Sequence, residues 1–346
     1  MIATRTVATR TVAGRFDTRA AGTPCAVTAV IVNFNAGRLL ADCLRSILPQ
    51  ADQVVLVDNA SDPDSFEPVV AAFASHPGLR VIRSPVNLGF AAGSNLGIAA
   101  ATEPRVLLLN PDCVVADGAV ARLCAALDAT PGAGLAGGLL TETSGLEQGG
   151  GRRAVPTPWR SFVRAFGLSR LSHRWPKLFD DFHLHRQPLP AAPIGVEAIS
   201  GACMLVDRAA LDDIGLLDEG FFLHCEDLDY GMRARSRGWK ILFVPDAPVV
   251  HHKGVCGRDR QLFVEWHKHK GMVRFYRKHF RHQYPAGLMA AVVFGVWLRF
   301  SAIATRLLAA RAAAAARTAW SGSGHRPAMR PVDGSPFEIS PHPSAS

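Results

Sequence analysis

Two acidic residues stand where runs of aliphatic and β-branched residues end. Asp58 directly follows Val54–Val57, and Asp112 follows Val106–Leu109 with two residues between. Each run is typical of a buried strand, and open α/β sheets bind ligands beyond the carboxyl ends of their strands. We therefore expect both carboxylates to face one rim of a sheet. There Asp58 suits hydrogen bonds to a base or ribose, and Asp112 suits a hard divalent cation on a diphosphate. The alternative is that both acids serve only turns and helix N-caps.

A third acidic group lies far along the chain. Glu226, Asp227 and Asp229 open a predicted helix, where the helix dipole favours negative charge. Asp229 is expected to pair with Arg233 on one helix face, four residues on. Glu226 and Asp227 remain at the helix start behind two aromatic residues, and a carboxylate near apolar surface is a candidate general base. Helix capping is the alternative.

Two further motifs carry polar groups that could bind a ligand. The segment Asn87–Asn95 is rich in small residues, which allow a backbone to approach a ligand or a sheet closely. It lacks the ending of a phosphate-binding P-loop, and no dinucleotide-binding glycine motif follows the first strand. The adjacent His251 and His252 end the last predicted strand, and one imidazole could complete a metal site begun by Asp112. The alternative is an ordinary pair of surface or core histidines.

Strands and helices alternate in the part of the chain that must position these residues. We expect buried strands at 26–32, 54–57, 79–82 and 106–109, and helices at 39–48, 66–73, 90–101 and 119–127. A strand pair at 196–206, a helix at 226–237 and short strands at 241–244 and 248–251 follow. This alternation indicates an α/β fold with a mostly parallel central sheet flanked by helices.

Residues 142–195 break this pattern. They contain three consecutive glycines, several prolines and a mixed charge load, so we interpret them as an irregular insertion and a candidate substrate loop.

The C-terminal part has a different character. Residues 253–282 hold nine Lys and Arg against two acids, with aromatic residues between them. The uncharged run Ala286–Leu298 follows, and its thirteen residues are too few to span about 30 Å of hydrocarbon as a helix. The pattern favours an interfacial helix or a re-entrant hairpin at an anionic membrane, with His267 and His269 on a solvated or lipid-facing surface. The alternative is an ordinary packed helical subdomain.

Composition sets broad limits. The net charge of +9 permits phosphate-bearing substrates, anionic lipid or nucleic acid without selecting one. The seven cysteines are scattered, with no C-x-x-C pair, and we expect them to be reduced core residues of a cytosolic protein. Residues 1–24 lack the apolar core of a signal peptide and are expected to be a disordered leader. Residues 321–346, rich in Ser, Gly and Pro, are expected to be a disordered tail.

Taken in order, the motifs resemble the inverting family 2 glycosyltransferases of the GT-A fold, and more narrowly the rhamnosyltransferase-like branch that builds bacterial cell-envelope polysaccharide. The motifs that carry the resemblance are Val30–Asn35, Val57–Ser61, Asn87–Asn95, Leu109–Asp112, Ser200–Met204, Phe222–Asp229 and Val250–His252. The resemblance covers about residues 26–256. It implies a glycosyltransferase domain over 25–256. From the charge and hydropathy pattern described above, we expect a membrane-associating helical region over 257–320.

The resemblance also implies roles for individual residues. The nucleotide sugar is expected to contact Asn33, Asn35, Asp58, Asn59, Asn87, Gly89, Asn95 and Asn110. Asp112 fills the last place of the family's Asp-x-Asp motif and is expected to bind Mg²⁺ or Mn²⁺ with His251 or His252. The first place of that motif is Asn110, which departs from the family pattern. Asp227 is expected to be the catalytic base, with Glu226 as its neighbour.

The function that follows is inverting transfer of a sugar from a nucleotide-diphosphate donor, such as dTDP-rhamnose, to a hydroxyl of a glycan or of a polyprenyl-diphosphate-linked acceptor. The enzyme is expected in the cytoplasm, peripheral to the inner face of the cell membrane. Two rivals stay open: a non-catalytic nucleotide-binding scaffold on the same fold, and a nucleotidyltransferase. Nucleic acid is not an expected partner, because carboxylates at the strand ends oppose such a ligand.

Overall fold

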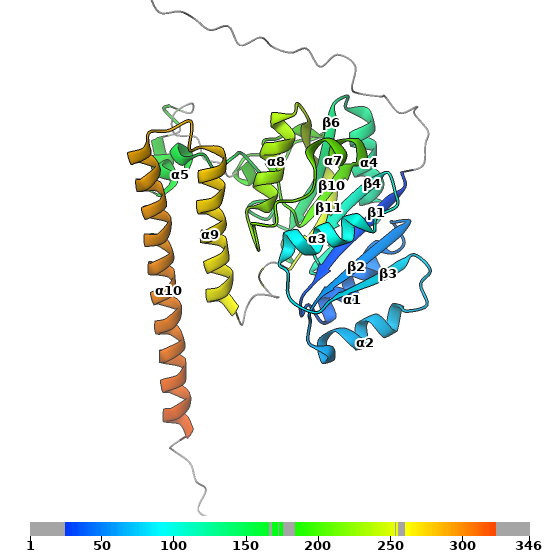
Figure 1. Ribbon diagram of the computed structural model, residues 1–346, viewed down its shortest axis with the longest axis horizontal. Helices are drawn as coiled ribbons and strands as arrows, with labels where there is room; N and C mark the ends of the chain where they lie inside the picture. Colours follow the sequence, from blue (N-terminus) through cyan, green and yellow to red (C-terminus); the bar gives the residue numbers. More distant parts are fainter. Residues whose placement is uncertain are drawn as a thin grey trace, which may run out of the picture. The chain divides into compact units, whose positions relative to one another are not determined.

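The computed structural model describes residues 25–165, 168–171, 173–175, 184–252, 254 and 260–322. The predicted leader at 1–24 and nearly all of the predicted tail at 321–346 lie outside these residues. Contacts divide the chain into two units after Phe300. The first unit contains the sheet and its helices, and the second begins within the long C-terminal helix (Figure 1).

One mixed sheet forms the centre of the first unit (Figure 1). Its strands follow the order β3-β2-β1-β4-β10-β6-β11-β5, and β8 also pairs with β11. The pairings give β1 to β4, β6 and β11 one direction, while β10, β5 and β8 run against them. The strand bounds are β1 Val27–Asn33, β2 Gln53–Asn59, β3 Leu79–Ser84, β4 Arg105–Leu109, β5 Cys113–Val115, β6 Ala133–Thr141, β8 Ile194–Gly195, β10 Cys203–Asp207 and β11 Lys240–His251.

Helices cover both faces of this sheet. One core contains buried side chains of α1 (Arg38–Ile47), α2 (Pro63–Phe73) and α4 (Ala119–Ala129). The opposite core contains side chains of α3 (Phe90–Ala99), α7 (Arg208–Ile214) and α8 (Glu226–Ser236). The predicted α/β architecture with a mostly parallel sheet is confirmed. Its physical reason is that strands with continuous apolar runs need cover on both faces.

The sequence patterns do not predict one central strand, and they predict another as two separate strands. Strand β6, with the sequence AGLAGGLLT, lies between β10 and β11. Its glycines have a weak strand propensity, yet close packing requires them: a Cβ at Gly137 would lie 2.9 Å from Ile199. The two short strands predicted at 241–244 and 248–251 are one strand, β11, whose register shifts between Val244 and Pro248.

Within residues 142–195, predicted as an irregular insertion, the structure contains several short regular elements. It contains strand β7 (Arg152–Arg153), helix α5 (Pro158–Ala165), the 3-10 turns Leu168–Leu171 and Leu184–Arg186, and strand β8. Strand β7 pairs with β9 (Ala198–Ile199) in a separate two-stranded sheet. These elements are too short for any periodic pattern to identify them.

Two helices form the C-terminal part of the described chain. Helix α9, Gln261–His279, contributes Val273, Phe275 and Tyr276 to a third apolar core, together with Met289 and Val296 of α10. The expectation of a surface position for His269 is wrong, because its side chain is fully buried and bonds to the Glu265 carbonyl. That hydrogen bond satisfies Nδ1, while Nε2 is buried without a hydrogen-bond partner among the described residues.

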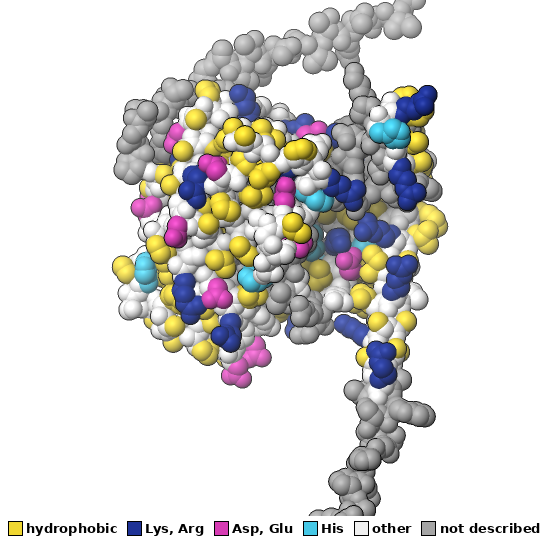
Figure 2. Space-filling model, turned by 180° about the vertical axis from the view of Figure 1, so that it is seen from behind, with side chains coloured by type: hydrophobic (Ala, Val, Ile, Leu, Met, Phe, Trp, Pro, Cys, Tyr) yellow, Lys and Arg dark blue, Asp and Glu magenta, His cyan; other side chains and the backbone are white. Residues whose placement is uncertain are grey.

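Helix α10 is continuous over Ala286–Gly322. Its segment Ala286–Ala314 has the length and mean hydropathy of a membrane span, with 11% of its most apolar window buried. The run without charge ends at residue 298, but the helix continues past Arg299. Figure 2 shows basic side chains at intervals among the hydrophobic ones along this helix.

The prediction that all seven cysteines are reduced is wrong for one pair. Cys25 and Cys124 form a disulfide across 99 positions of sequence, with their Cα atoms 6.1 Å apart. Cys25 immediately precedes strand β1, and Cys124 lies on α4, so no sequence spacing reveals their meeting. Cys43, Cys113, Cys203 and Cys225 are free and buried, as expected. Cys256 lies outside the described residues.

Candidate active site

The first predicted ligand group forms a connected polar network where β1 and β2 end. The Asn33 amide donates to the Ser61 hydroxyl at 2.9 Å and approaches Asp58 at 3.5 Å. The backbone N–H groups of Ser61 and Asn35 complete the network, donating to Asp58 and to the Ser61 hydroxyl. The structure therefore brings Asn33, Asn35 and Asp58 together, and their role in binding the base and ribose stays a prediction.

A second network joins the end of β2 to the start of α3. The Asn59 side-chain amide donates to Asn87 Oδ1 and to the Gly89 carbonyl, both at 3.0 Å, and its oxygen accepts from the Leu88 N–H. Gly89 has a φ of +83°, and a Cβ there would lie 2.4 Å from the Phe222 carbonyl oxygen. Glycine is therefore required for close contact with the loop that precedes α8.

Asn95 lies apart from this network. Its amide donates to the Leu217 carbonyl and to Glu219, and its oxygen accepts from the Leu217 N–H. These bonds attach helix α3 to the 217–219 loop and account for the polar side chain. Its contact with a nucleotide sugar stays a prediction.

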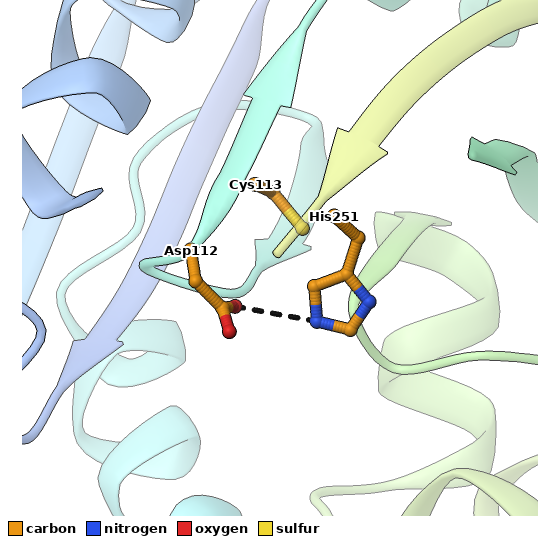
Figure 3. Close-up of side chains that lie close together, drawn as sticks. All are labelled: Asp112, Cys113 and His251. Atoms are coloured by element: carbon orange, nitrogen blue, oxygen red, sulfur yellow. Dashed lines mark ion pairs between the residues drawn. The ribbon is translucent and has the colours of Figure 1, made fainter. Parts of the chain in front are cut away.

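Asp112 and His251 meet at the neighbouring part of the same sheet edge (Figure 3). His251 Nε2 lies 3.3 Å from Asp112 Oδ1 and 3.4 Å from Asn110 Nδ2. All three residues follow or end strands with one direction, β4 and β11, so the parallel register brings them to one rim. Asp112 and His251 are buried with 6% and 8% exposure, which separates this group from an ordinary solvated acid.

His251 is the histidine of the predicted metal group. Among the described residues, the ligand atoms of Asp112, Cys113 and His251 lie within 4.8 Å of one another, and His252 does not belong to this set. His252 donates its backbone N–H to the Asp112 carbonyl instead. The alternation of side chains along an extended chain sends neighbouring histidines in opposite directions.

Cys113 fits a metal ligand poorly. Burial and the nearby Asp112 charge raise the pKa of its thiol well above the usual range. The thiol donates to the Ala202 carbonyl at 3.4 Å. Metals bind the thiolate, and Mg²⁺ and Mn²⁺ prefer oxygen and imidazole ligands, so Asp112 and His251 fit such an ion better than Cys113 does; their role as ligands stays a prediction.

Asp227 lies at the start of α8 with both carboxylate oxygens engaged. Oδ2 forms an ion pair with Arg153 and accepts from the Gly201 N–H at 3.2 Å. Oδ1 accepts from the Leu228 N–H at 2.7 Å. The predicted pairing of Asp229 with Arg233 is confirmed at 2.9 Å, so Asp229 belongs to the helix and leaves Glu226 and Asp227 for chemistry.

Glu226 is buried beside Asp227. Its Oε2 atom has no hydrogen-bond partner among the described residues. Desolvation and then the Asp227 charge raise the pKa of Glu226 to about 8.

Two backbone groups link the Asp227 group to the Asp112 group. Gly201 donates to Asp227, and the next residue, Ala202, accepts from the Asn110 N–H at 2.9 Å. Both acids therefore lie at the edge where β4 ends and β10 begins. A pocket beside Arg160 and Trp239 and another beside Asp42 and Val115 are not lined by the three acids Asp58, Asp112 and Asp227.

The sequence reading missed Gln148 and Arg153. Gln148 contacts His251, and Arg153 contacts Asp227, across more than 70 positions of sequence. The only signal was the tandem Arg152-Arg153 after three glycines, inside the stretch interpreted as irregular.

The fold and this carboxylate-lined edge define a glycosyltransferase. The family model described as "Glycosyltransferase like family 2" matches residues 24–284, and the chain belongs to this family. The matched region includes the sheet, both acid groups and α9.

The chain is similar to the N-acetylglucosaminyl-diphospho-decaprenol L-rhamnosyltransferase of Mycobacterium tuberculosis. They are 30% identical over 71% of this chain and 82% of that protein. It is also 24% identical to the low-salt glycan biosynthesis hexosyltransferase Agl10 of Haloferax volcanii, over 65% of this chain and 67% of that protein.

Among solved structures, the fold is similar to that of a mannosyltransferase from Pyrobaculum calidifontis in complex with GDP-Man and Mn²⁺. The TM-score is 0.50 at 18% identity, and the match covers 87% of this chain and 81% of that one. This likeness supports the GT-A architecture.

Proposed function

We infer that this glycosyltransferase moves L-rhamnose from dTDP-rhamnose to a hydroxyl of N-acetylglucosamine on a polyprenyl diphosphate, during synthesis of cell-envelope polysaccharide. The name of the Mycobacterium tuberculosis relative supports the sugar and the acceptor, because the alignment covers 82% of that protein. The observation that carries the proposal is the shared sheet edge of Asp112, His251 and Asp227, linked through Gly201 and Ala202.

Asp227 acts as the general base. It is held at the start of α8 by the Gly201 and Leu228 N–H groups, and it removes the proton of the acceptor hydroxyl. The acceptor oxygen then forms a bond to the anomeric carbon as the bond to the nucleoside diphosphate breaks. A single displacement of this kind inverts the anomeric centre.

Asp112 and His251 hold a divalent ion, Mg²⁺ or Mn²⁺. The set of a carboxylate oxygen and an imidazole nitrogen suits such ions, and Asn110 stands beside them at 3.4 Å from His251. The ion supplies Lewis-acid stabilisation of the charge on the departing diphosphate. The networks around Asp58 and Asn59 bind the base and ribose.

The C-terminal helices bring the enzyme to the cytoplasmic membrane surface. Helix α9 carries basic residues throughout, and α10 is apolar and sparsely buried. Such a combination binds anionic lipid and suits an acceptor that is itself membrane-bound. Removal of residues 285–346 should shift the enzyme from the membrane fraction to the soluble fraction, and an unchanged distribution would exclude this role.

The direct test is turnover with a synthetic polyprenyl-diphosphate N-acetylglucosamine acceptor and Mn²⁺. We expect dTDP release with dTDP-rhamnose and less with UDP- or GDP-sugars. Turnover with another donor instead would show that the transferred sugar is not rhamnose. Absence of turnover with every donor would support a non-catalytic scaffold, and pyrophosphate release would indicate a nucleotidyltransferase.

A further inference from the structure

The segment Glu147–Arg153 touches both halves of the active site. Gln148 bonds to His251, and Arg153 pairs with Asp227. Neither residue belongs to the motifs that carry the family resemblance. The segment follows strand β6 and ends in β7, so it reaches from one catalytic group to the other.

Arg152 anchors this segment in the protein. Its side chain is 2% exposed, forms two hydrogen bonds to Glu147 at 2.8 and 3.0 Å, and donates to the Gln187 and Pro188 carbonyls. The guanidinium also stacks over the Phe243 ring of β11. Because a bidentate Arg–carboxylate pair fixes geometry strongly, the two ends of the segment are held together.

Gln148 determines which nitrogen of His251 carries the proton. The Gln148 amide nitrogen donates to the His251 carbonyl at 3.2 Å, which can only accept. The remaining Oε1 atom therefore faces Nδ1 at 2.7 Å, and Nδ1 must donate. In the neutral imidazole, Nε2 then presents its lone pair, 3.4 Å from the Asn110 amide nitrogen.

This tautomer leaves two electron-pair donors facing each other. His251 Nε2 lies 3.3 Å from Asp112 Oδ1. A cation bound here would take both atoms as ligands, and a hydrogen bond from the outer nitrogen of a ligating histidine is the usual means of orienting its ring. Gln148 occupies that outer position.

Arg153 acts on the base. Strand alternation sends Arg152 and Arg153 to opposite faces of β7, one into the anchor and the other to Asp227. Its guanidinium pairs with Oδ2, while the Gly201 and Leu228 N–H groups hold the carboxylate from the backbone. These contacts together fix the position of the Asp227 carboxylate.

We propose that the segment Glu147–Arg153 is a positioning element: Gln148 sets the tautomer and ring orientation of the metal ligand His251, and Arg153 holds the base Asp227. The proposal rests on the proposed function. It adds that both catalytic groups depend on one anchored segment outside the recognised motifs.

The metal arm is tested by Mn²⁺ binding to the donor-free full-length enzyme, measured by calorimetry. Gln148→Leu should weaken Mn²⁺ binding by about 10–100-fold, the usual cost of losing such a partner. Gln148→Glu keeps an acceptor for Nδ1–H and should bind Mn²⁺ at least as well as the wild type. Equal weakening in both variants would overturn the positioning role of Gln148.

A measurement on the wild type removes any dependence on how the variants fold. Nitrogen-15 NMR of histidine-labelled enzyme, with His251→Asn to assign the signal, should show His251 protonated at Nδ1. Protonation at Nε2 overturns this arm. If the wild type has this tautomer but does not bind Mn²⁺, the proposed metal function fails and the tautomer assignment stands.

The base arm is tested by separating kcat from donor binding. Arg153→Leu should lower kcat by about tenfold or more, within the range of general-base effects, with a donor Kd within about threefold of the wild type. Arg153→Lys should restore part of the loss, because it returns the charge without the guanidinium geometry. Donor affinity falling in step with kcat, or no rescue by lysine, would overturn this role.

Discussion

The two ends of the candidate site differ in how far the protein satisfies its own polar groups. Around Asp58 and Asn59, amides, hydroxyls and backbone N–H groups bond to one another in a closed network. Around Asp112 and Glu226, His251 Nε2 faces a carboxylate oxygen, and Glu226 Oε2 is buried without a partner among the described residues. The closed network shapes a binding surface, whereas the second end holds groups that a cation or a proton must balance.

Asp227→Asn should give the largest effect if chemistry is confined to the second end. The amide cannot take a proton, so kcat should fall by about 10²–10⁴-fold. Because the backbone contacts of residue 227 remain possible, the donor Kd should stay within about threefold. Turnover and donor binding are measured separately, and a matching loss of donor affinity would mean that the base is misassigned.

Asp112→Ala tests whether the second end of the site binds a metal ion. Loss of a direct ligand should weaken Mn²⁺ binding by more than about 100-fold, beyond the cost of losing a residue that only hydrogen-bonds to a ligand. Donor binding should lose its dependence on divalent ions. Asp58→Asn in the closed network is the control and should leave Mn²⁺ affinity unchanged. If Asp112→Ala binds Mn²⁺ as the wild type does, Asp112 is not a metal ligand.

Gly89→Ala tests the closed network through stability. Its Cβ would meet the Phe222 carbonyl at 2.4 Å, and φ is +83°. We expect a loss of about 2–4 kcal/mol of unfolding free energy from backbone strain and overpacking. Gly145→Ala is the control, since φ is +82° with nothing within 4 Å of the added Cβ, and it should cost only about 1–2 kcal/mol. Equal losses in denaturant unfolding would show that the contact with Phe222 is not tight.

Glu226→Gln should change how stability depends on pH. Burial raises the folded-state pKa of Glu226 to about 8 from 4.5. The folded protein therefore binds more protons than the unfolded chain between these values, and this contribution to stability falls as pH rises through the window. The variant should lose that part of the decline. Parallel unfolding curves for variant and wild type from pH 5 to 8 would show that Glu226 is already ionised.

Much of the fold is readable in the sequence, because β1, β2 and β4 are continuous apolar runs and α1 has a clear helical period. The three acid groups are readable for a related reason. Asp58 and Asp112 stand where apolar strands end, and the Glu226 group stands where a helix begins. Strand β6 is missed because its glycines are selected by close contacts with Ile199 and Ala247, which no local pattern records. Gln148 and Arg153 are missed because their partners lie 103 and 74 positions away.

The proposed function is tested most directly by measuring rhamnose transfer from dTDP-rhamnose to polyprenyl-diphosphate N-acetylglucosamine. The wild type and Asp227→Asn are compared at saturating Mn²⁺. We expect the wild type to form an inverted glycosidic linkage and to release dTDP. We expect the variant to do neither, while it still binds the donor. Transfer at comparable rates by the two proteins would contradict this expectation.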